Sequence, residues 1–296
     1  MAEQNWLAGK FEENRGHLRA VAYRMLGSAT EADDAVQEAW LRLSRTNAEG
    51  IENLGGWLTT VVSHVCLDML RSRKSRSEEP ISAEANEAPP KEIPAKTIDP
   101  ESEAILADSV GLALLVVLDR LAPAERLAFV LHDMFAVPFE EIAEIVGRTP
   151  EATRQLASRA RRRVQGAPVT TDATRSEQRK LVDAFLAALR AGDLEGLVAV
   201  LDPDMVFRAD AASAVGGAAR EIHGAEVWAH QAMLYSRGAR HVQAAMVDGS
   251  VGLILAPGGR LLRALKLKIE NGKIKEVEVI GEKEHLAQIE LAVLEN

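Results

Sequence analysis

The sequence predicts a multi-domain protein with two all-α domains, the second a helix-turn-helix, followed by an α+β domain with a curved antiparallel sheet. In the N-terminal half, apolar residues recur at helical spacing. Residues 77–101 contain five prolines, many Glu and Ala residues and no apolar period, which is typical of a flexible acidic linker. The C-terminal part begins with helical patterns and continues as alternating segments joined by turns such as Asn271-Gly272, which favours an α+β layout.

The composition excludes several classes of protein. The 296 residues give room for two or three domains, and no apolar run is long enough to span a bilayer. The N-terminal residues lack the apolar core of a signal peptide, so we expect a cytoplasmic protein that does not bind membranes. Cys66 is the only cysteine, which excludes an internal disulfide and a cysteine-cluster metal site.

Positive charge is concentrated in one short stretch of an acidic chain. The formal net charge is −9, but residues 148–166 carry six basic side chains and one acidic side chain. Such an island is a localised electrostatic footprint for nucleic acid. Because the rest of the chain has little excess positive charge, we expect weak DNA binding by the protein alone and a partner that holds most of the DNA.

Two helices are predicted before residue 46, with a break near Gly27-Ser28. The second begins at Thr30 or Asp33 and is amphipathic. Its inward positions are Ala35, Val36, Ala39, Trp40 and Leu43, and its polar positions are Asp33, Asp34, Gln37, Glu38 and Arg42. On composition alone, this polar face is solvated surface.

A third amphipathic helix follows from Trp57 and ends in four basic residues. These are Arg71, Arg73, Lys74 and Arg76. Cations at a helix C-terminus interact favourably with the helix dipole, which is a sufficient structural reason for them. With Ser63, His64, Asp68 and Ser72 as hydrogen-bonding groups, the same helix also fits a DNA-binding surface.

The segment from Pro123 to Arg163 has the pattern of a helix-turn-helix. Gly147 ends one helix, Thr149 caps the next, and Pro150 occupies its first position. The inward stripe of the second helix is Thr153, Leu156, Ala157, Ala160 and Val164, and the outward residues are Arg154, Gln155, Ser158, Arg159, Arg161 and Arg162. Arginine can bind guanine and phosphate, and glutamine can bind adenine, in a major groove. The alternative is an ordinary helical hairpin with a solvated cationic face.

Three motifs, in this order, resemble an extracytoplasmic-function sigma factor, the promoter-specificity subunit of bacterial RNA polymerase. They are EADDAVQEAWLRL, WLTTVV with CLDMLR, and the block from PAERLAFVLHDM to EEIAEIVGRTPEATRQLASRARRR. The resemblance covers a little over half of the chain. It implies an N-terminal tail (1–10), a region 2 domain (11–76), a linker (77–103), a region 4 domain (104–166), a short linker (167–175) and a further domain (176–296).

The resemblance also implies roles for particular residues. Residues expected to dock on core RNA polymerase are Asp33, Asp34, Gln37, Glu38 and Leu41. Residues expected to melt and bind the −10 promoter element are Trp57, Ser63, His64, Asp68, Arg71, Ser72, Arg73, Lys74 and Arg76. Residues expected at the −35 element are Arg148, Thr149, Glu151, Arg154, Gln155, Ser158, Arg159, Arg162 and Arg163, of which Arg159, Arg162 and Arg163 would hold phosphate.

The domain over residues 176–296 resembles the SnoaL-like, ketosteroid-isomerase-like cone. Its predicted elements are a helix from Ser176 to Gly192, a short second helix, a strand over MVFRAD, a helix near 225–235, several strands and a last helix from Glu282 to Leu294. A subgroup of these sigma factors carries such an extension, which implies regulation in cis through an intramolecular contact. The subgroup has an Asp-Gly-Gly-Gly motif where this chain has Asp210-Ala211-Ala212-Ser213.

Two other functions remain open at this point. One is a conventional helix-turn-helix regulator with a ligand-sensing domain, and the other is a SnoaL-like isomerase or cyclase with a DNA-binding appendage. Acid–base candidates for the second are Asp204, Asp210, His223, His230 and His241, of which Asp210 and His223 are the foremost. The histidines show no metal-ligand spacing, so we expect no enzyme, metal or cofactor, although the cone leaves room for a small ligand.

Overall fold

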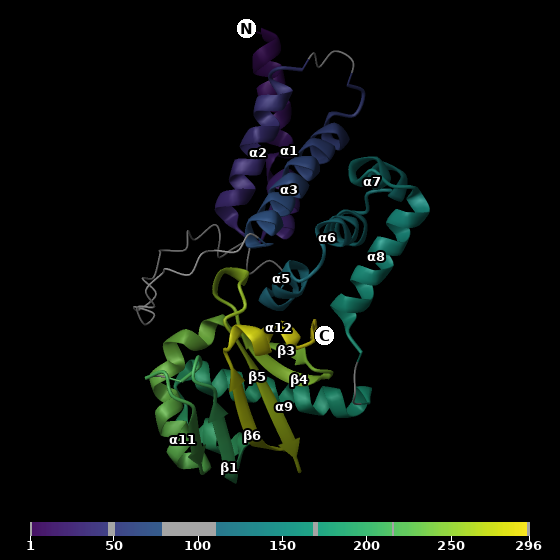
Figure 1. Cartoon of the computed structure of the whole chain (residues 1–296). Coiled ribbons are helices and arrows are strands. Elements are labelled where there is room, and N and C mark those ends of the chain that lie inside the picture. The colour runs from purple at the N-terminus through teal and green to yellow at the C-terminus, as the bar shows by residue number, and fades with distance from the viewer. Residues whose placement is uncertain (1, 47–50, 79–110, 168–170, 215, 295–296) are drawn as a thin grey trace. The chain divides into compact units, whose positions relative to one another are not determined.

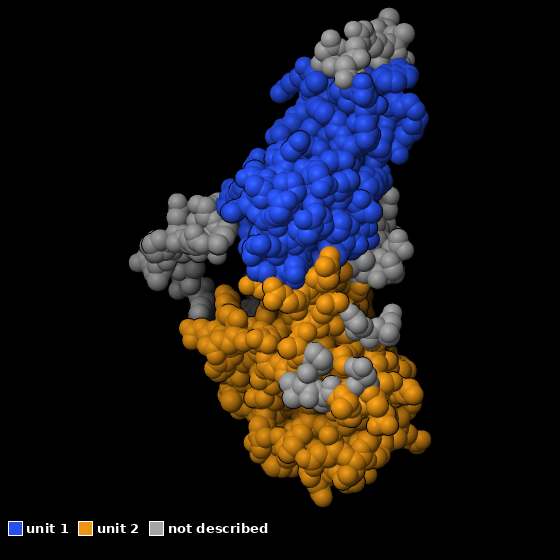
Figure 2. Space-filling view, turned by 90° about the vertical axis from the view of Figure 1, so that its right-hand side faces the viewer, with its two compact units in different colours: residues 1–110, 121–160 blue, residues 111–120, 161–296 orange. Residues whose placement is uncertain are grey.

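The computed structural model describes residues 2–46, 51–78, 111–167, 171–214 and 216–294 (Figure 1). The chain divides into two compact units, one with residues 1–110 and 121–160 and the other with residues 111–120 and 161–296 (Figure 2). The predicted linker (77–103) lies outside the described residues except at its first two positions, as does the predicted helical stretch 104–110.

The first unit begins with three helices, α1 (Ala2–Leu26), α2 (Ala29–Leu43) and α3 (Leu54–Glu78). Helix α1 ends before Gly27, whose φ of 73° suits the left-handed region. The Ser28 side chain then caps α2 by accepting the backbone N–H of Glu31, so α2 starts earlier than predicted. Helix α1 begins at Ala2, so residues 2–10, which are predicted to be an N-terminal tail, are helical in this structure.

The apolar stripes of these helices form a helical core. Ala35, Val36, Ala39 and Leu43 of α2 are buried as predicted. Trp40 is partly buried and packs on Phe11 of α1, with ring centroids 5.1 Å apart. Cys66 is fully buried, and burial raises the pKa of its thiol to about 12, so this cysteine acts as a small hydrophobic residue.

The same unit contains most of the helix-turn-helix. Helix α6 (Pro123–Phe129) continues as a π-helical turn (Val130–Met134), and α7 (Phe139–Val146) and α8 (Pro150–Gln165) follow. Gly147 has a φ of 70°, and the Thr149 hydroxyl accepts the N–H of Ala152 at 3.2 Å. Both the predicted stop and the predicted cap are therefore confirmed.

Contacts within this unit join α6 and the π-helical turn to α1 and α3. Arg126 of α6 is 1% exposed, and its Nε donates to the backbone oxygen of Arg24 at 3.2 Å. The Phe135 ring meets the His17 ring edge-on at 5.2 Å, and the Arg24 guanidinium lies 5.3 Å from the centre of the same Phe135 ring. Residues of α1 and of the helix-turn-helix segment thus share one packed interface.

The second unit is built on a seven-stranded sheet in the order β2-β1-β6-β5-β4-β3-β7. The strands are β1 (Leu201–Ala209), β2 (Arg220–His223), β3 (Val242–Val247), β4 (Ser250–Leu255), β5 (Arg263–Glu270), β6 (Lys273–Ile280) and β7 (Leu291–Ala292). The pairs are antiparallel as predicted, except that β1 and β6 are parallel. Register shifts in β1–β6 and β5–β6 mark bulges, which bend strands.

Helices α9 (Asp172–Ala191), α10 (Leu194–Val200) and α11 (Ala225–Ala232) pack on the sheet (Figure 1). The core between helices and sheet includes Phe185, which stacks on Trp228 at 5.8 Å, and Phe207, which contacts the same indole at 5.7 Å. Asn271 and Gly272 both have positive φ, which confirms the predicted tight hairpin. This arrangement agrees with the α+β cone that the sequence predicts.

Three elements differ from the sequence prediction. Strand β2 was not predicted. Helix α9 begins after Thr171, whose side chain accepts the N–H of Thr174, rather than at Ser176, so the predicted linker 167–175 is partly helical. The last predicted helix is only α12 (Lys283–Gln288), because the chain then extends to form β7 on β3 and gains ladder hydrogen bonds.

Helix α5 (Leu112–Asp119) belongs to the second unit, although it lies far from the sheet domain in the sequence. Six of its eight residues are buried, and it packs on β3, on β7 and on a short turn at Pro257–Gly259. In the described parts of the chain, no helix has both the length and the apolar character needed to cross a membrane.

Candidate nucleic-acid and polymerase interfaces

Helix α8 separates an apolar face from a cationic face, as the sequence predicts. The inward residues Thr153, Leu156, Ala157, Ala160 and Val164 are all buried, with at most 8% exposure. All nine predicted −35 residues are exposed: Arg148, Thr149, Glu151, Arg154, Gln155, Ser158, Arg159, Arg162 and Arg163. Arg161, which is also predicted to face outward, is only partly exposed.

Some of these side chains are held by neighbouring elements. The Arg154 guanidinium lies 5.1 Å from the centre of the Phe139 ring, which stacks on His132 at 3.8 Å. This contact holds the Arg154 guanidinium, in the second turn of α8, beside the aromatic pair. Arg159 Nε donates to the carboxylate of Glu125 at 2.9 Å, so Arg159 also ties α8 to α6. The sequence alone did not reveal either contact.

The predicted polymerase-docking residues form one outward face of α2. Asp33, Asp34 and Gln37 are exposed and Glu38 is partly exposed. Arg19 of α1 makes two hydrogen bonds to the Asp33 carboxylate, at 2.7 and 3.3 Å. Leu41 is 38% exposed and is one of the few large apolar side chains at the described surface.

The predicted −10 residues on α3 divide into accessible and buried groups. Asp68, Arg71 and Ser72 are exposed, and Trp57 and His64 are partly exposed. The side chains of Lys74 and Arg76 lie outside the described residues. Ser63 is fully buried, so the prediction that it faces DNA does not hold in this structure.

Arg73 has a structural role that the sequence did not indicate. Its Nη2 donates to the Glu31 carboxylate at 2.5 Å, and its guanidinium also approaches the backbone oxygen of Leu26 at 3.4 Å. It therefore ties the end of α3 to α1 and α2, while its side chain stays 40% exposed.

Asp210 lies at the end of β1 and binds the chain where α12 begins. Its Oδ1 accepts the N–H of Ser213 at 2.8 Å, and its Oδ2 accepts the N–H groups of Gly281 and Glu282 at 2.7 and 2.9 Å. Burial opposes ionisation, but these hydrogen bonds outweigh it and lower the pKa of Asp210. The residue therefore acts as a structural tie between two loops.

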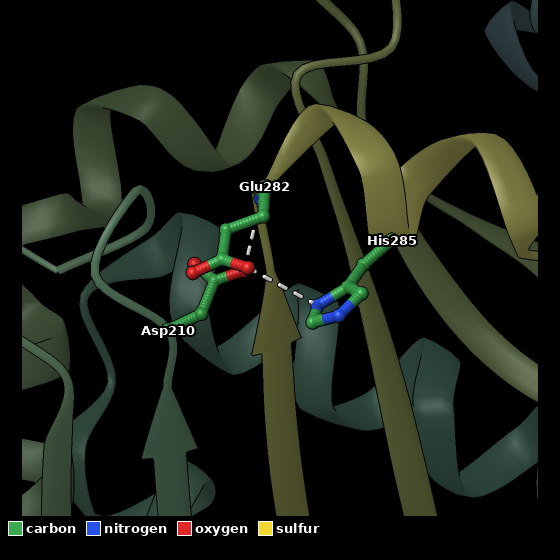
Figure 3. A group of neighbouring side chains, drawn as sticks. All are labelled: Asp210, Glu282 and His285. Carbon is green, nitrogen blue, oxygen red and sulfur yellow. Dashed lines mark hydrogen bonds and ion pairs between the residues drawn. The ribbon is translucent and has the colours of Figure 1, made fainter.

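Asp210, Glu282 and His285 bring possible metal-ligand atoms within 4.8 Å of one another (Figure 3). No spacing in the sequence indicates this cluster, because Asp210 lies 72 residues from Glu282. The Asp210 carboxylate already accepts three backbone N–H groups, and Glu282 pairs with His285 at 3.3 Å one helical turn away. The hydrogen bonds from backbone N–H groups explain the position of Asp210, and the contact between Glu282 and His285 explains theirs, so the cluster does not require a metal.

A cavity of about 680 Å³ adjoins this cluster. Its lining mixes basic residues (Arg208, Arg220, Lys266), acidic residues (Asp210, Glu221, Asp248, Glu278), apolar residues of β1 and β6, and part of α12. Arg208 is already paired with Glu221, and Lys266 with Asp248. Most of the charges in the cavity are thus balanced by one another.

The other acid–base candidates are not brought together with Asp210. His223 pairs with Val206 in the β1–β2 ladder, four residues along the strand from Asp210, or roughly 13 Å. It is bonded instead to the exposed Glu221 at 2.7 Å. His230 contacts the Glu226 backbone oxygen, His241 contacts Arg240, and Asp204 is exposed. These positions give no support to the isomerase alternative.

Comparisons with known proteins match both helical segments of the chain. Residues 11–76 match the family profile of Sigma-70 region 2, and residues 111–164 match that of Sigma-70, region 4. The probable ECF RNA polymerase sigma factor SigI of Mycobacterium tuberculosis is 34% identical over 280 residues, which cover 95% of this chain and 94% of the relative.

The ECF RNA polymerase sigma factor SigJ of the same organism is 41% identical over 218 residues, 73% of this chain and 69% of the relative. The crystal structure of SigJ overlaps 93% of this chain and 96% of its own, with 35% identity and a TM-score of 0.46. The sequence relatives are sigma factors, which favours this function over the helix-turn-helix regulator and isomerase alternatives. With its region 2 and region 4 matches in order and SigI similar over almost its whole length, the chain belongs to the ECF RNA polymerase sigma factor family.

Proposed function

We propose that this protein binds core RNA polymerase, directs initiation at a specific set of promoters, and is regulated in cis by its C-terminal domain. The observation that carries the proposal is helix α8, which buries an uninterrupted stripe and exposes every predicted −35 residue. A chain with net charge −9 and one cationic helix needs a partner that contributes DNA affinity. Core polymerase is that partner, which places the protein in the cytoplasm.

The polymerase-docking surface in this proposal is the outward face of α2. Its residues are Asp33, Asp34, Gln37, Glu38 and Leu41. Leu41 supplies the apolar contact, and the surrounding carboxylates supply charge that a basic surface on the polymerase would complement.

The −35 element would be bound by the outward face of α8. Arg148, Glu151, Arg154, Gln155 and Ser158 are placed toward base edges or the nearest phosphates, and Arg162 and Arg163 toward phosphate. Thr149 and Arg159 contribute mainly by holding the helix, through the N-cap and the Glu125 contact.

The −10 element would be bound by α3. Trp57, His64, Asp68, Arg71 and Ser72 carry accessible polar or aromatic groups. Lys74 and Arg76 follow them in the sequence as further basic residues. An unstacked base needs an aromatic or polar pocket, and a single strand needs cations along its backbone. Ser63 is left out because it is buried, and Arg73, whose side chain is 40% exposed, would add a cation although it also holds Glu31.

Run-off transcription with purified core polymerase and the full chain tests the proposal, with Leu41→Glu as the diagnostic variant. We expect promoter-specific transcript from the wild type and a loss of at least about tenfold for Leu41→Glu, since a buried charge without a partner weakens an interface. Leu262→Glu makes the same change at a site of similar exposure, 41%, in the C-terminal domain, and should keep docking intact. Tight duplex binding by the chain alone, with no transcript and no complex with core polymerase, would overturn the proposal.

A further inference from the structure

The two ends of region 4 are bonded to the C-terminal domain. The region 4 profile begins at residue 111 and ends at residue 164, and both ends lie in the second unit of the structure. Helix α5 is at one end and the last turn of α8 is at the other. The contacts at each end are specific hydrogen bonds in addition to apolar packing.

The N-terminus of α5 is capped by a residue of the sheet. Gly111 at the N-cap position has no side chain to accept the first free N–H groups of the helix. Gln243 of β3 supplies the acceptor, since its Oε1 lies 3.4 Å from the N–H of Ala113. A Cβ at residue 111 would lie 3.1 Å from the same oxygen, so a larger residue there would make the Gln243 side chain shift.

The C-terminus of α5 is held by Arg120. Its Nη1 donates to the backbone oxygen of Ile289, and its Nη2 donates to that of Leu286 at 2.7 Å. These two carbonyls belong to the end of α12, where a short helix leaves acceptors without intrahelical partners. Burial at this site lowers the pKa of Arg120, which agrees with a guanidinium enclosed by its acceptors.

The last turn of α8 is bonded to the chain just after β7. The N–H of Val293 donates to the Val164 oxygen at 2.8 Å, while Leu291 and Ala292 pair with Val247 and Met246 of β3. Gly166 follows with a φ of 67°, and a Cβ there would lie 2.5 Å from that of Ala292. The segment 289–293 therefore contacts both ends of region 4.

We propose that the C-terminal domain controls region 4 by holding α5 at both ends, through Gln243 at its N-terminus and through the contacts of Arg120 with the end of α12 at its C-terminus. We call these two sets of contacts the clasp. The clasp opens before region 4 is fully engaged in promoter binding. The inference rests on the proposed function, and it names the surface through which the regulation acts. Because the clasp stabilises the free protein, weakening it shifts the population toward the form that can be repositioned on polymerase and promoter.

Hydrogen exchange of the full-length protein tests whether Arg120 holds α5. In Arg120→Ala, the amides of residues 112–119 should exchange about tenfold faster, as expected for the loss of hydrogen bonds from a charged group. The amides of β5 and β6 should keep the wild-type rate, which shows that the domain remains folded. Lys283→Ala removes the same charge from an exposed position on α12, and exchange in α5 should not change.

Gln243→Leu is a second, independent variant that keeps the side-chain size and removes the acceptor. It should also raise exchange in α5, most strongly at the first turn. Unchanged exchange in both Arg120→Ala and Gln243→Leu would overturn the clasp.

Run-off transcription separates the clasp from the proposed function. Arg120→Ala should give several-fold more promoter-specific transcript than the wild type, and Lys283→Ala the wild-type amount. If the wild type is active and Arg120→Ala gives the same amount of transcript, the regulatory clasp is wrong while the sigma-factor function stands. If no variant gives transcript or binds core polymerase, the proposed function fails, and with it the regulatory role of the clasp.

Discussion

Asp210 joins three backbone groups through one carboxylate, and this gives a prediction for Asp210→Asn. The amide nitrogen of asparagine cannot accept the N–H groups that the lost oxygen bound, so the second unit should lose about 1–3 kcal/mol of unfolding free energy. Native-state hydrogen exchange of β1 and β6 measures the loss. Asp204→Asn, at an exposed carboxylate near the start of the same strand, is the matched control and should change little.

The effect of Asp210 should depend on pH in one direction. Its pKa is lowered in the folded protein from an ordinary value of 3.8. The stabilisation is therefore complete above the unfolded pKa and is lost as the pH falls through the folded pKa. The difference between wild type and Asp210→Asn should shrink in acid, and a constant difference from neutral to acid pH would contradict the assignment.

His17 has the opposite relation to acid. Burial lowers the pKa of its imidazole, which contacts Thr59 at 3.4 Å and the Phe135 ring. Above pH 6.5 the ring is neutral in both folded and unfolded chains, and below it the unfolded chain binds the proton more tightly. Acidification from pH 7.5 to 5.5 should therefore destabilise the first unit, and His17→Gln should reduce this loss. We would follow urea unfolding at both pH values, with His230→Gln in the other unit as control.

At the scale of elements, helix α8 should contain two kinds of contact that respond differently to substitution. Arg162→Ala should weaken polymerase–promoter complexes on all promoters alike and lower the slope of log affinity against log salt by about 1. Gln155→Ala should change the preference among −35 sequences and leave the salt slope unchanged. Binding of the holoenzyme to a set of −35 variants at several salt concentrations distinguishes them. The same promoter-independent loss in both variants would contradict the division.

Strand β4 leaves no room for a side chain at Gly252. A Cβ there would lie 2.6 Å from the backbone oxygen of Leu265 on β5 and 2.8 Å from Val247. Gly252→Ala should therefore separate β4 from β5 and cost about 1–3 kcal/mol of unfolding free energy. Gly238→Ala meets no atom within 4 Å and is the matched control. Equal stability of the two variants by thermal unfolding would show that the sheet can adjust without cost.

Elements with strong local signals could be predicted from the sequence, and elements defined by distant partners could not. The stripe of α8, the Gly147 stop and the Asn271-Gly272 hairpin follow from periodicity and backbone preferences of adjacent residues. Strand β2 is short and almost entirely exposed, so it lacks the alternation that reveals a strand. Helix α12 was predicted too long because the pairing of β7 with β3 overrides local helix preference.

The same distinction between local signals and distant partners applies to the candidate sites. Helical periodicity and the family motifs together predict which residues of α8 and α2 are exposed. The roles of Arg73, Arg120 and Asp210 depend on partners tens of residues away or more, and no spacing rule connects them. Ser63 is buried, although a serine is usually exposed, because it lies on α3 among the residues that face the helical core.

At the scale of the whole molecule, region 4 cannot be separated cleanly from the C-terminal domain. Leu115, Val116, Val117 and Leu118 of α5 are each at most 3% exposed, and α5 packs on β3 and β7. Removal of residues 176–296 should expose apolar surface on α5, so the fragment 1–175 should bind a hydrophobic dye and self-associate. Size-exclusion chromatography with dye fluorescence measures this. A monomeric fragment without dye binding would contradict the prediction.

The distance in sequence between α5 and its covering strands also has a consequence for synthesis. Ribosomes add about 5–20 residues per second, so α5 leaves the ribosome roughly 10–30 s before β7 is made. During this interval a helix that is apolar on nearly all sides has no completed sheet to cover it. Slow translation between α5 and the sheet would lengthen this interval, so the nascent chain should need either fast synthesis of these residues or a chaperone that covers α5.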